Sequence, residues 1–84
     1  MYKRQEFLAI LAKDASKYVR EAVAKHYNTP LETFAVLAED ADPRVRRALV
    51  FNGSVPLEVL KRLKQDQHVG IRIAAADVAA RRNN

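Results

Sequence analysis

The stretch Leu37-Ala-Glu-Asp-Ala-Asp-Pro-Arg-Val-Arg46 decides the fold, because versions of it occur three times along the chain. The other copies begin at Leu11 and Leu63, so successive copies are 26 residues apart. Five columns keep this register, and they hold leucine, aspartate, an aliphatic residue, arginine and alanine: Leu11/Leu37/Leu63, Asp14/Asp40/Asp66, Val19/Val45/Ile71, Arg20/Arg46/Arg72 and Ala22/Ala48/Ala74. A fixed period of this length is the signature of a repeat protein.

Each copy contains the signals for two helices. In the second copy, Thr29-Pro30 supplies a capping residue and a proline that we expect at the first helical position. Asp42-Pro43 supplies the same signals for the next helix, and Asn52-Gly53 ends it. Gly53 is expected to adopt the left-handed conformation that often follows a helix. No segment alternates between apolar and polar residues with period two, so no strand is expected.

The apolar spacing predicts which face of each second helix is buried. The predicted inward faces are Val19, Ala22 and Val23 in the first copy and Val45, Ala48 and Leu49 in the second. We interpret the all-alanine column as a close helix contact that leucine would overpack. Ala38 shares its column with Ala12 and Lys64, which predicts that larger side chains are tolerated there.

These signals predict one all-α domain, residues 1–84, with helix-pair repeats at about 3–28, 29–54 and 55–82. The pattern Leu-x2-Asp-x4-Val-Arg-x-Ala, preceded by Thr-Pro-x3-Leu, resembles HEAT repeats and resembles even more the leucine-rich repeat variant family of bacterial proteins. The resemblance covers Lys3 to Arg82 and implies a short α-solenoid, a superhelix of stacked helix pairs. One relative carries a cysteine-ligated iron–sulfur cluster, which cannot transfer because this chain has no cysteine.

Composition narrows the possible classes of function. Without cysteine, disulfides, thiolate metal sites and a cysteine nucleophile are excluded. The formal net charge of +5 favours acidic partners or nucleic acid. No stretch approaches the roughly 20 apolar residues that span a bilayer. We therefore expect a soluble, cytoplasmic protein that does not associate with membranes.

The sequence offers no catalytic, cofactor or metal constellation, so we expect a protein that is not an enzyme. His26 and His68 occupy different columns, and neither stands at metal-ligand spacing from another ligand. His68 shares its column with Ser16 and Asp42, the expected helix caps.

The recurring aspartate and arginine resemble an acid–base pair, but they have a structural interpretation. A catalytic site needs to exist only once, whereas a residue found in every repeat usually serves the stacking of repeats. We expect these side chains to hydrogen-bond across a repeat boundary or to backbone donors at a helix start. The structural set is Asp14, Arg20, Asp40, Arg46, Asp66 and Arg72.

The repeat does not use the charges of Lys17, Lys25, Arg44 and Arg47 in the second helices. The candidate binding set takes three of these cations and two aromatic residues: Lys17, Tyr18, Arg44, Arg47 and Phe51. The leading hypothesis is a non-catalytic interaction module that binds an acidic protein partner through this face. The alternative is binding to the nucleic-acid backbone, motivated by the net charge and the arginines. An ordinary solvated helix face would have the same composition.

The last helix contains Ile71-Arg-Ile-Ala-Ala-Ala-Asp-Val-Ala-Ala80, which is apolar over more than one face. Ile73 lies in the column of Glu21 and Arg47, where the other repeats are charged. Terminal repeats normally carry a polar outer face, as solubility demands. The sequence therefore also suggests a homodimer through this helix, which we expect to end near Arg81.

Overall fold

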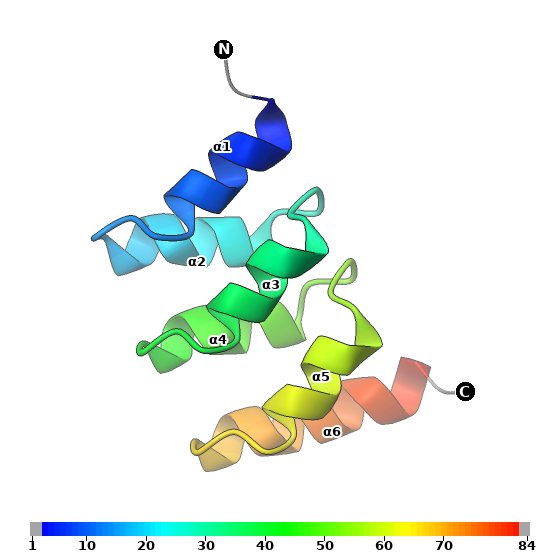
Figure 1. Cartoon of the computed structure of the whole chain (residues 1–84). Coiled ribbons are helices and arrows are strands. Elements are labelled where there is room, and N and C mark those ends of the chain that lie inside the picture. Colours follow the sequence, from blue (N-terminus) through cyan, green and yellow to red (C-terminus); the bar gives the residue numbers. More distant parts are fainter. Residues whose placement is uncertain (1–2, 83–84) are drawn as a thin grey trace.

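The fold is all-helical. The structure, a computed structural model, describes residues 3–82, and within this range it contains six α-helices and no strand. They are α1 (Arg4–Leu11), α2 (Lys17–Lys25), α3 (Leu31–Leu37), α4 (Pro43–Val50), α5 (Leu57–Leu63) and α6 (Val69–Arg82) (Figure 1). The predicted fold class, all-α, is confirmed.

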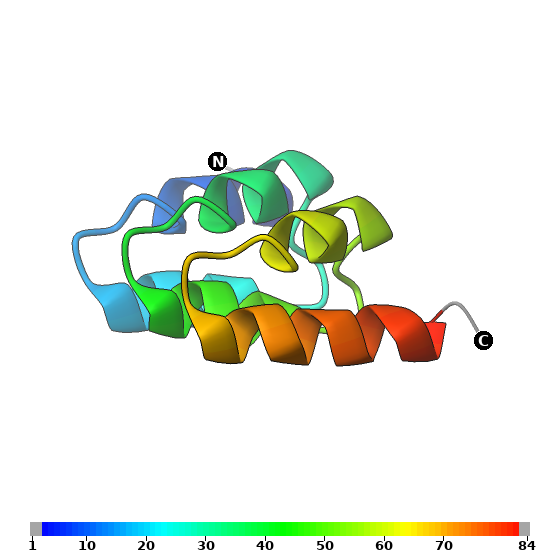
Figure 2. The same cartoon turned by 90° about the horizontal axis from the view of Figure 1, so that it is seen from below.

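The helices lie in two layers (Figure 2). The layer of α1, α3 and α5 covers the layer of α2, α4 and α6, and α4 packs between α2 and α6. The molecule is elongated, with principal extents of 40 × 25 × 15 Å. Its two ends are therefore formed by different helices, α1 with α2 at one end and α5 with α6 at the other (Figure 1).

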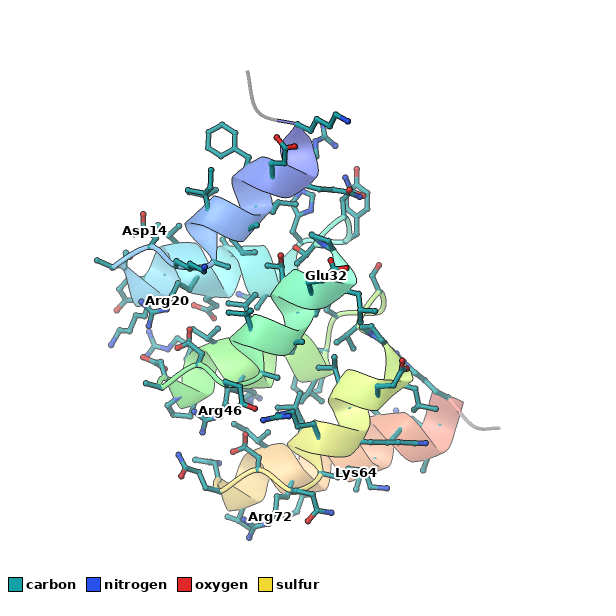
Figure 3. All side chains as sticks on the ribbon, in the orientation of Figure 1. Asp14, Arg20, Glu32, Arg46, Lys64 and Arg72 are labelled. Carbon is teal, nitrogen blue, oxygen red and sulfur yellow. The ribbon has the colours of Figure 1, made fainter. Side chains whose placement is uncertain are left out.

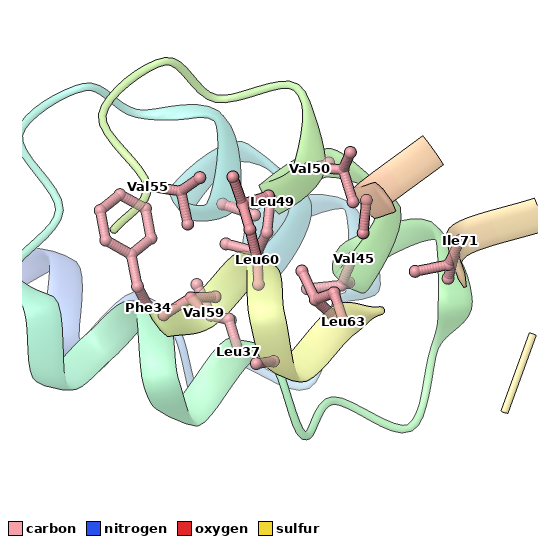
Figure 4. Packing of buried hydrophobic residues seen from close by; sticks show 14 of the residues in the cluster. Phe34, Leu37, Val45, Leu49, Val50, Val55, Val59, Leu60, Leu63 and Ile71 are labelled. Atoms are coloured by element: carbon pink, nitrogen blue, oxygen red, sulfur yellow. The ribbon is translucent and has the colours of Figure 1, made fainter. Parts of the chain in front are cut away.

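The core lies between the two layers. Leu37 of α3, Leu49 of α4 and Leu60 of α5 are fully buried, and Figure 4 shows their side chains packed together with those of neighbouring helices. Each buried side chain of this size stabilises the fold by about 1.5 to 3 kcal/mol relative to an exposed one. Most of this core belongs to the middle of the chain, so the molecule is packed best around α4.

The helices of the second layer begin at equivalent caps. The Ser16 hydroxyl accepts the Val19 N–H at 3.4 Å, and the Asp42 carboxylate accepts the Arg44 N–H at 2.8 Å. In the third repeat, His68 Nδ1 accepts the N–H of Gly70 at 3.1 Å. Asp42 and Ser16 are therefore caps as predicted, and His68 fills the same position with an imidazole nitrogen in place of an oxygen.

Helix α3 begins one residue later than predicted, and α5 begins in the same way. Pro30 is the N-cap of α3 and Pro56 is the N-cap of α5, so neither proline occupies the first helical position. The prediction that Thr29 caps α3 is wrong. Its buried hydroxyl instead donates to the Val23 carbonyl at 2.8 Å, which satisfies the end of the preceding helix.

The end of α4 is stabilised by a side chain. The prediction that Gly53 adopts the left-handed conformation is wrong, because neither glycine of the chain has a positive φ. Asn52 is buried, and its Oδ1 accepts the Ser54 N–H at 2.9 Å. Its Nδ2 donates to the carbonyls of Ala24 and His26 at 2.8 and 3.0 Å, so it also satisfies the end of α2. An Asn side chain that bonds the local backbone sets the turn without help from glycine.

In the third repeat, Val78 stands in the column of Asn52 and cannot make these bonds. The helix α6 is longer than its equivalents and extends through Arg82, in agreement with the end predicted near Arg81. Arg82 donates to the carbonyls of Asn52 and Val55. One further helical turn thus brings an arginine to the backbone acceptors at the end of α4.

Two column-based expectations about burial are wrong. Ala48 is buried but Ala22, in the same column, is exposed, because no helix of the described chain covers that side of α2. Ala38 is as buried as Ala48, at 6% against 9% exposure, so we expect it to tolerate larger side chains no better than Ala48 does. Lys64 in the column of Ala38 is exposed because it belongs to the last repeat.

We expect Ala38→Leu to lower the free energy of unfolding by about 1 to 3 kcal/mol, because the added atoms overpack a filled position. The matched control is Lys64→Leu in the same column, which should change stability by less than about 0.5 kcal/mol because the site is exposed. Urea denaturation followed by circular dichroism measures both. Equal stabilities for the two variants would show that Ala38 is not a tight contact.

Candidate functional site

The recurring arginines and aspartates link neighbouring copies of the 26-residue sequence pattern, and we call each copy a repeat. The Arg20 guanidinium bonds both carboxylate oxygens of Asp40, from Nε at 2.8 Å and from Nη2 at 3.2 Å. Arg46 makes the same two bonds to Asp66, at 2.7 and 3.2 Å. In both pairs the arginine belongs to one repeat and the aspartate to the next. Figure 3 shows Arg20 and Arg46 at equivalent ends of α2 and α4.

Each arginine also bonds backbone within its own repeat. The third guanidinium nitrogen, Nη1, donates to a backbone carbonyl. Arg20 bonds the Asp14 carbonyl at 2.9 Å, Arg46 bonds the Asp40 carbonyl at 2.6 Å, and Arg72 bonds the Asp66 carbonyl at 2.7 Å. Each aspartate Oδ1 accepts the N–H two residues on, at 2.8 to 2.9 Å. These groups are therefore occupied by structural hydrogen bonds, and we refer to them together as the Arg–Asp ladder.

Burial makes the ladder electrostatically strong. The side chains of Arg46 and Asp66 are each only 5% exposed, so water screens their attraction poorly. Burial by itself raises the pKa of Asp66, but the hydrogen bonds from Arg46 and from the His68 N–H outweigh it and hold the pKa below its ordinary value. The hydrogen bond to Asp40 raises the pKa of Arg20. The lowered pKa keeps Asp66 ionised at neutral pH, opposite the Arg46 guanidinium.

The predicted binding residues form two aromatic–cation clusters on α2 and α4. The Tyr18 ring is 62% exposed, with the Lys17 ammonium 5.5 Å from its centroid and the Arg44 guanidinium 5.4 Å from it. The Phe51 ring is 59% exposed, and the Arg47 guanidinium lies 5.2 Å from its centroid. Exposed cation–π contacts of this kind are worth about 0.5 to 1 kcal/mol. All five residues are therefore grouped by the structure on the second layer.

A groove of about 330 Å³ lies between α2 and α4, beside these clusters. We call it the α2–α4 groove, and it is lined by Glu21, Lys25, Arg44, Arg47, Ala48, Phe51 and Asn52. Three of the five predicted residues line it, whereas Lys17 and Tyr18 lie outside its lining. The groove thus combines two guanidinium groups, an aromatic ring and a buried floor of Ala48 and Asn52.

The groove also contains residues that the prediction left out. Glu21 and Lys25 form an ion pair at 3.4 Å and line the α2 side. Their position in the lining of the groove depends on how α2 packs against α4, and the repeat columns do not show this packing. The one available signal is that Lys25 shares its column with Phe51.

Other basic residues of the second layer are already paired. Arg81 bonds Asp77 at 3.1 Å, Arg82 donates to two backbone carbonyls, and Arg20 and Arg46 belong to the ladder. Most of the positive charge on these helices is therefore neutralised or held within the protein. Arg44 and Arg47 are the exposed guanidinium groups that face the groove.

A second surface that the prediction left out is an apolar pocket of about 370 Å³ at the end formed by α1 and α2. We call it the N-terminal pocket, and its lining is Leu8, Leu11, Tyr18, Val19, Ala22, Val23 and His26. The column assignment placed Val19 and Ala22 on a buried face, so it gave no sign of an open pocket.

The histidines take local structural roles. His26 Nδ1 accepts the Asn28 N–H at 3.0 Å, and its ring stacks on Tyr27 with centroids 4.9 Å apart. His68 caps α6. Within residues 3–82, no group of three or more His, Asp or Glu side chains is placed to hold a metal ion, and no helix is long and apolar enough to cross a membrane.

The ladder predicts how stability depends on pH. Because the folded-state pKa of Asp66 is lowered, its stabilisation is complete above the unfolded pKa of about 3.9 and is lost as the pH falls through the folded-state value. We expect Asp66→Asn to cost about 3 kcal/mol at pH 7, since Arg46 keeps an unpaired buried charge. The difference from the wild type should shrink below about pH 3.9.

Urea denaturation at pH 7 and at a series of acidic pH values measures this difference. The control is Asp77→Asn, which removes an exposed ion pair on α6 and should change stability by at most about 0.5 kcal/mol at any pH. If the difference in free energy of unfolding between Asp66→Asn and wild type stayed constant as the pH fell below about 3.9, the stabilising role of ionised Asp66 would be contradicted.

Comparisons with protein-family models, with curated proteins and with solved structures find no match to this chain.

Proposed function

We propose that the chain is a short α-solenoid of three helix-pair repeats that works as a non-catalytic protein-binding module. The two-layer arrangement supports this architecture, as do the caps at Ser16, Asp42 and His68 and the ladder bonds that recur at the same columns. Stacked repeats offer a continuous surface made from equivalent positions, which suits binding to another macromolecule.

The binding surface is the α2–α4 groove together with the Tyr18 cluster. The observation that carries the proposal is the pairing of exposed aromatic rings with guanidinium groups at the rim of this groove. Tyrosine and arginine are enriched among the residues that dominate binding energy at protein interfaces. The rings also hold the arginines in place, so less side-chain entropy is lost when a partner binds.

The partner is an acidic protein segment that also carries an apolar side chain. A carboxylate forms two parallel hydrogen bonds with a guanidinium group, which favours Asp or Glu opposite Arg44 and Arg47. The Phe51 ring and the Ala48 methyl group provide apolar contact next to these charges. The Glu21–Lys25 pair on the other side of the groove offers one further site for a polar contact.

The alternative function is binding to the nucleic-acid backbone. The net charge of +5 favours it. The small number of free cations on the second layer favours the protein partner, because backbone binding uses many phosphate contacts. The two functions differ in salt dependence, since neutralising several phosphates makes affinity fall steeply as salt rises.

The test is the double variant Arg44→Glu with Arg47→Glu. We expect it to abolish binding, because two attractive charges become repulsive towards an acidic partner. Stability should fall by at most about 1 to 2 kcal/mol, because both side chains are exposed and only the two cation–π contacts are lost. The matched control is Lys13→Glu with Lys61→Glu, which makes the same change in net charge away from the groove.

The measurement is affinity capture from lysate with and without nuclease, followed by titration of the identified, purified partner against all three proteins. Nuclease-resistant capture that the control keeps and the groove variant loses supports the proposal. Strong, salt-sensitive binding to random duplex DNA that the groove variant loses would replace it with the alternative. Equal capture by all three proteins would place the functional surface elsewhere.

A further inference from the structure

The two ends of the molecule expose positions that are buried at the junctions between repeats. Ala24 and Val50 are fully buried by the repeat that follows each of them, whereas Ala76 in the same column is exposed. In another column Thr33 and Val59 are buried, whereas Phe7 is 52% exposed. The outer side of α6 is therefore equivalent to the side of α2 and of α4 that the next repeat covers. The α1–α2 end is equivalent to the side of each later repeat that covers the repeat before it.

The exposed side of α6 is apolar. Val69 and Ile73 are 58% and 66% exposed, and Ala76 and Ala80 are exposed with them. Their spacing of four, three and four residues places all four on one stripe of the helix. We call this the α6 stripe, and Arg72 lies along its edge.

The opposite end of the molecule offers a complementary surface. The N-terminal pocket is lined by Leu8, Leu11, Val19 and Ala22 among its apolar residues. In the middle repeat the residues of the same columns are Phe34, Leu37, Val45 and Ala48, and all of these are buried. The pocket is thus the open counterpart of a contact that the protein already makes internally.

Two columns whose residues face each other at an internal junction have different residue types at the two ends of the molecule. At the first internal junction, Glu21 and Arg44 face each other across the α2–α4 groove. The residues of the same columns at the two ends are Ile73 and Tyr18, both exposed. The charged pair of the first internal junction therefore corresponds to an isoleucine and an exposed aromatic ring at the ends, whereas the second internal junction has Arg47 and Gly70 in these columns.

The ladder is incomplete at both ends in a matching way. Arg72 donates Nη1 to the Asp66 carbonyl, as Arg20 and Arg46 do to their own repeats. Within residues 3–82, no carboxylate bonds Arg72 and no arginine side chain bonds the carboxylate of Asp14. One end thus carries the cation and the other end the anion of the same repeated pair.

We propose that copies of this chain associate head to tail, with the α6 stripe of one copy docked on the N-terminal pocket of the next copy. Arg72 then bonds Asp14 of the next copy as Arg46 bonds Asp66, and Ile73 packs against Tyr18 and Ala22 of the next copy. This contact continues the internal junction between repeats. Because it joins two different surfaces, it does not close on itself, and assembly proceeds beyond a dimer. The inference does not rest on the proposed function, and Tyr18 belongs to both surfaces.

The test blocks one end at a time with substitutions at exposed positions. Ile73→Glu places a charge on the α6 stripe, and Ala22→Glu places one in the N-terminal pocket. Leu31→Glu is the control, because Leu31 is an exposed apolar residue of α3 outside both surfaces. Circular dichroism and thermal melting establish that each variant is folded.

Sedimentation velocity measures the mass of each protein over a concentration series up to about 1 mM, where even weak contacts populate. We expect wild type and Leu31→Glu to form species larger than dimers, and each end-blocked variant to stay monomeric. An equimolar mixture of the two blocked variants should form dimers and nothing larger, because one compatible pair of ends remains. Monomeric wild type, a monomeric mixture, or a wild-type dimer that Ile73→Glu abolishes and Ala22→Glu leaves intact would each overturn the proposal.

Discussion

The interaction on which the rest of the structure depends is the bond from the arginine of one repeat to the aspartate of the next. The guanidinium groups of Arg20 and Arg46 each join three segments: their own helix, the loop that leads into that helix, and the loop before the next second-layer helix. All three contacts are satisfied only at one separation of the helices, so the link fixes the spacing between α2, α4 and α6. Removing one partner leaves the other charge buried without compensation, which makes the link intolerant of change.

The residues that stabilise the fold are different from the residues that are exposed for binding. The ladder and the caps occupy the first turns of α2, α4 and α6, and Asn52 and Arg82 satisfy the helix ends. The side chains of Tyr18, Arg44, Arg47 and Phe51 are exposed and take no part in these bonds, so they are available to a partner. In a protein whose repeated residues serve the fold, the residues that differ between repeats are the better candidates for recognition.

The sequence predicted the helices and their caps because both depend on local signals at Ser16 and Asp42 and on a constant period. Prediction from the sequence failed where residues of the same column differ in burial. Ala22 and Lys64 belong to the ends of the molecule and are exposed, although their equivalents Ala48 and Ala38 are buried. The charge of Lys25 could be read from the sequence, but its pairing with Glu21 in the groove and the conformation of Gly53 could not, because they depend on side chains that meet only after the helices pack.

The most direct test of the central claim is a double-mutant cycle on Arg46 and Asp66, measured as free energies of unfolding at pH 7. If the pair links the repeats, the two alanine substitutions are strongly non-additive, with a coupling of about 1 to 3 kcal/mol. The same cycle on the exposed pair Arg81 and Asp77 should give at most about 0.5 kcal/mol. Additive costs for Arg46 and Asp66 would contradict the account, because the stacking of repeats would then depend on apolar packing alone.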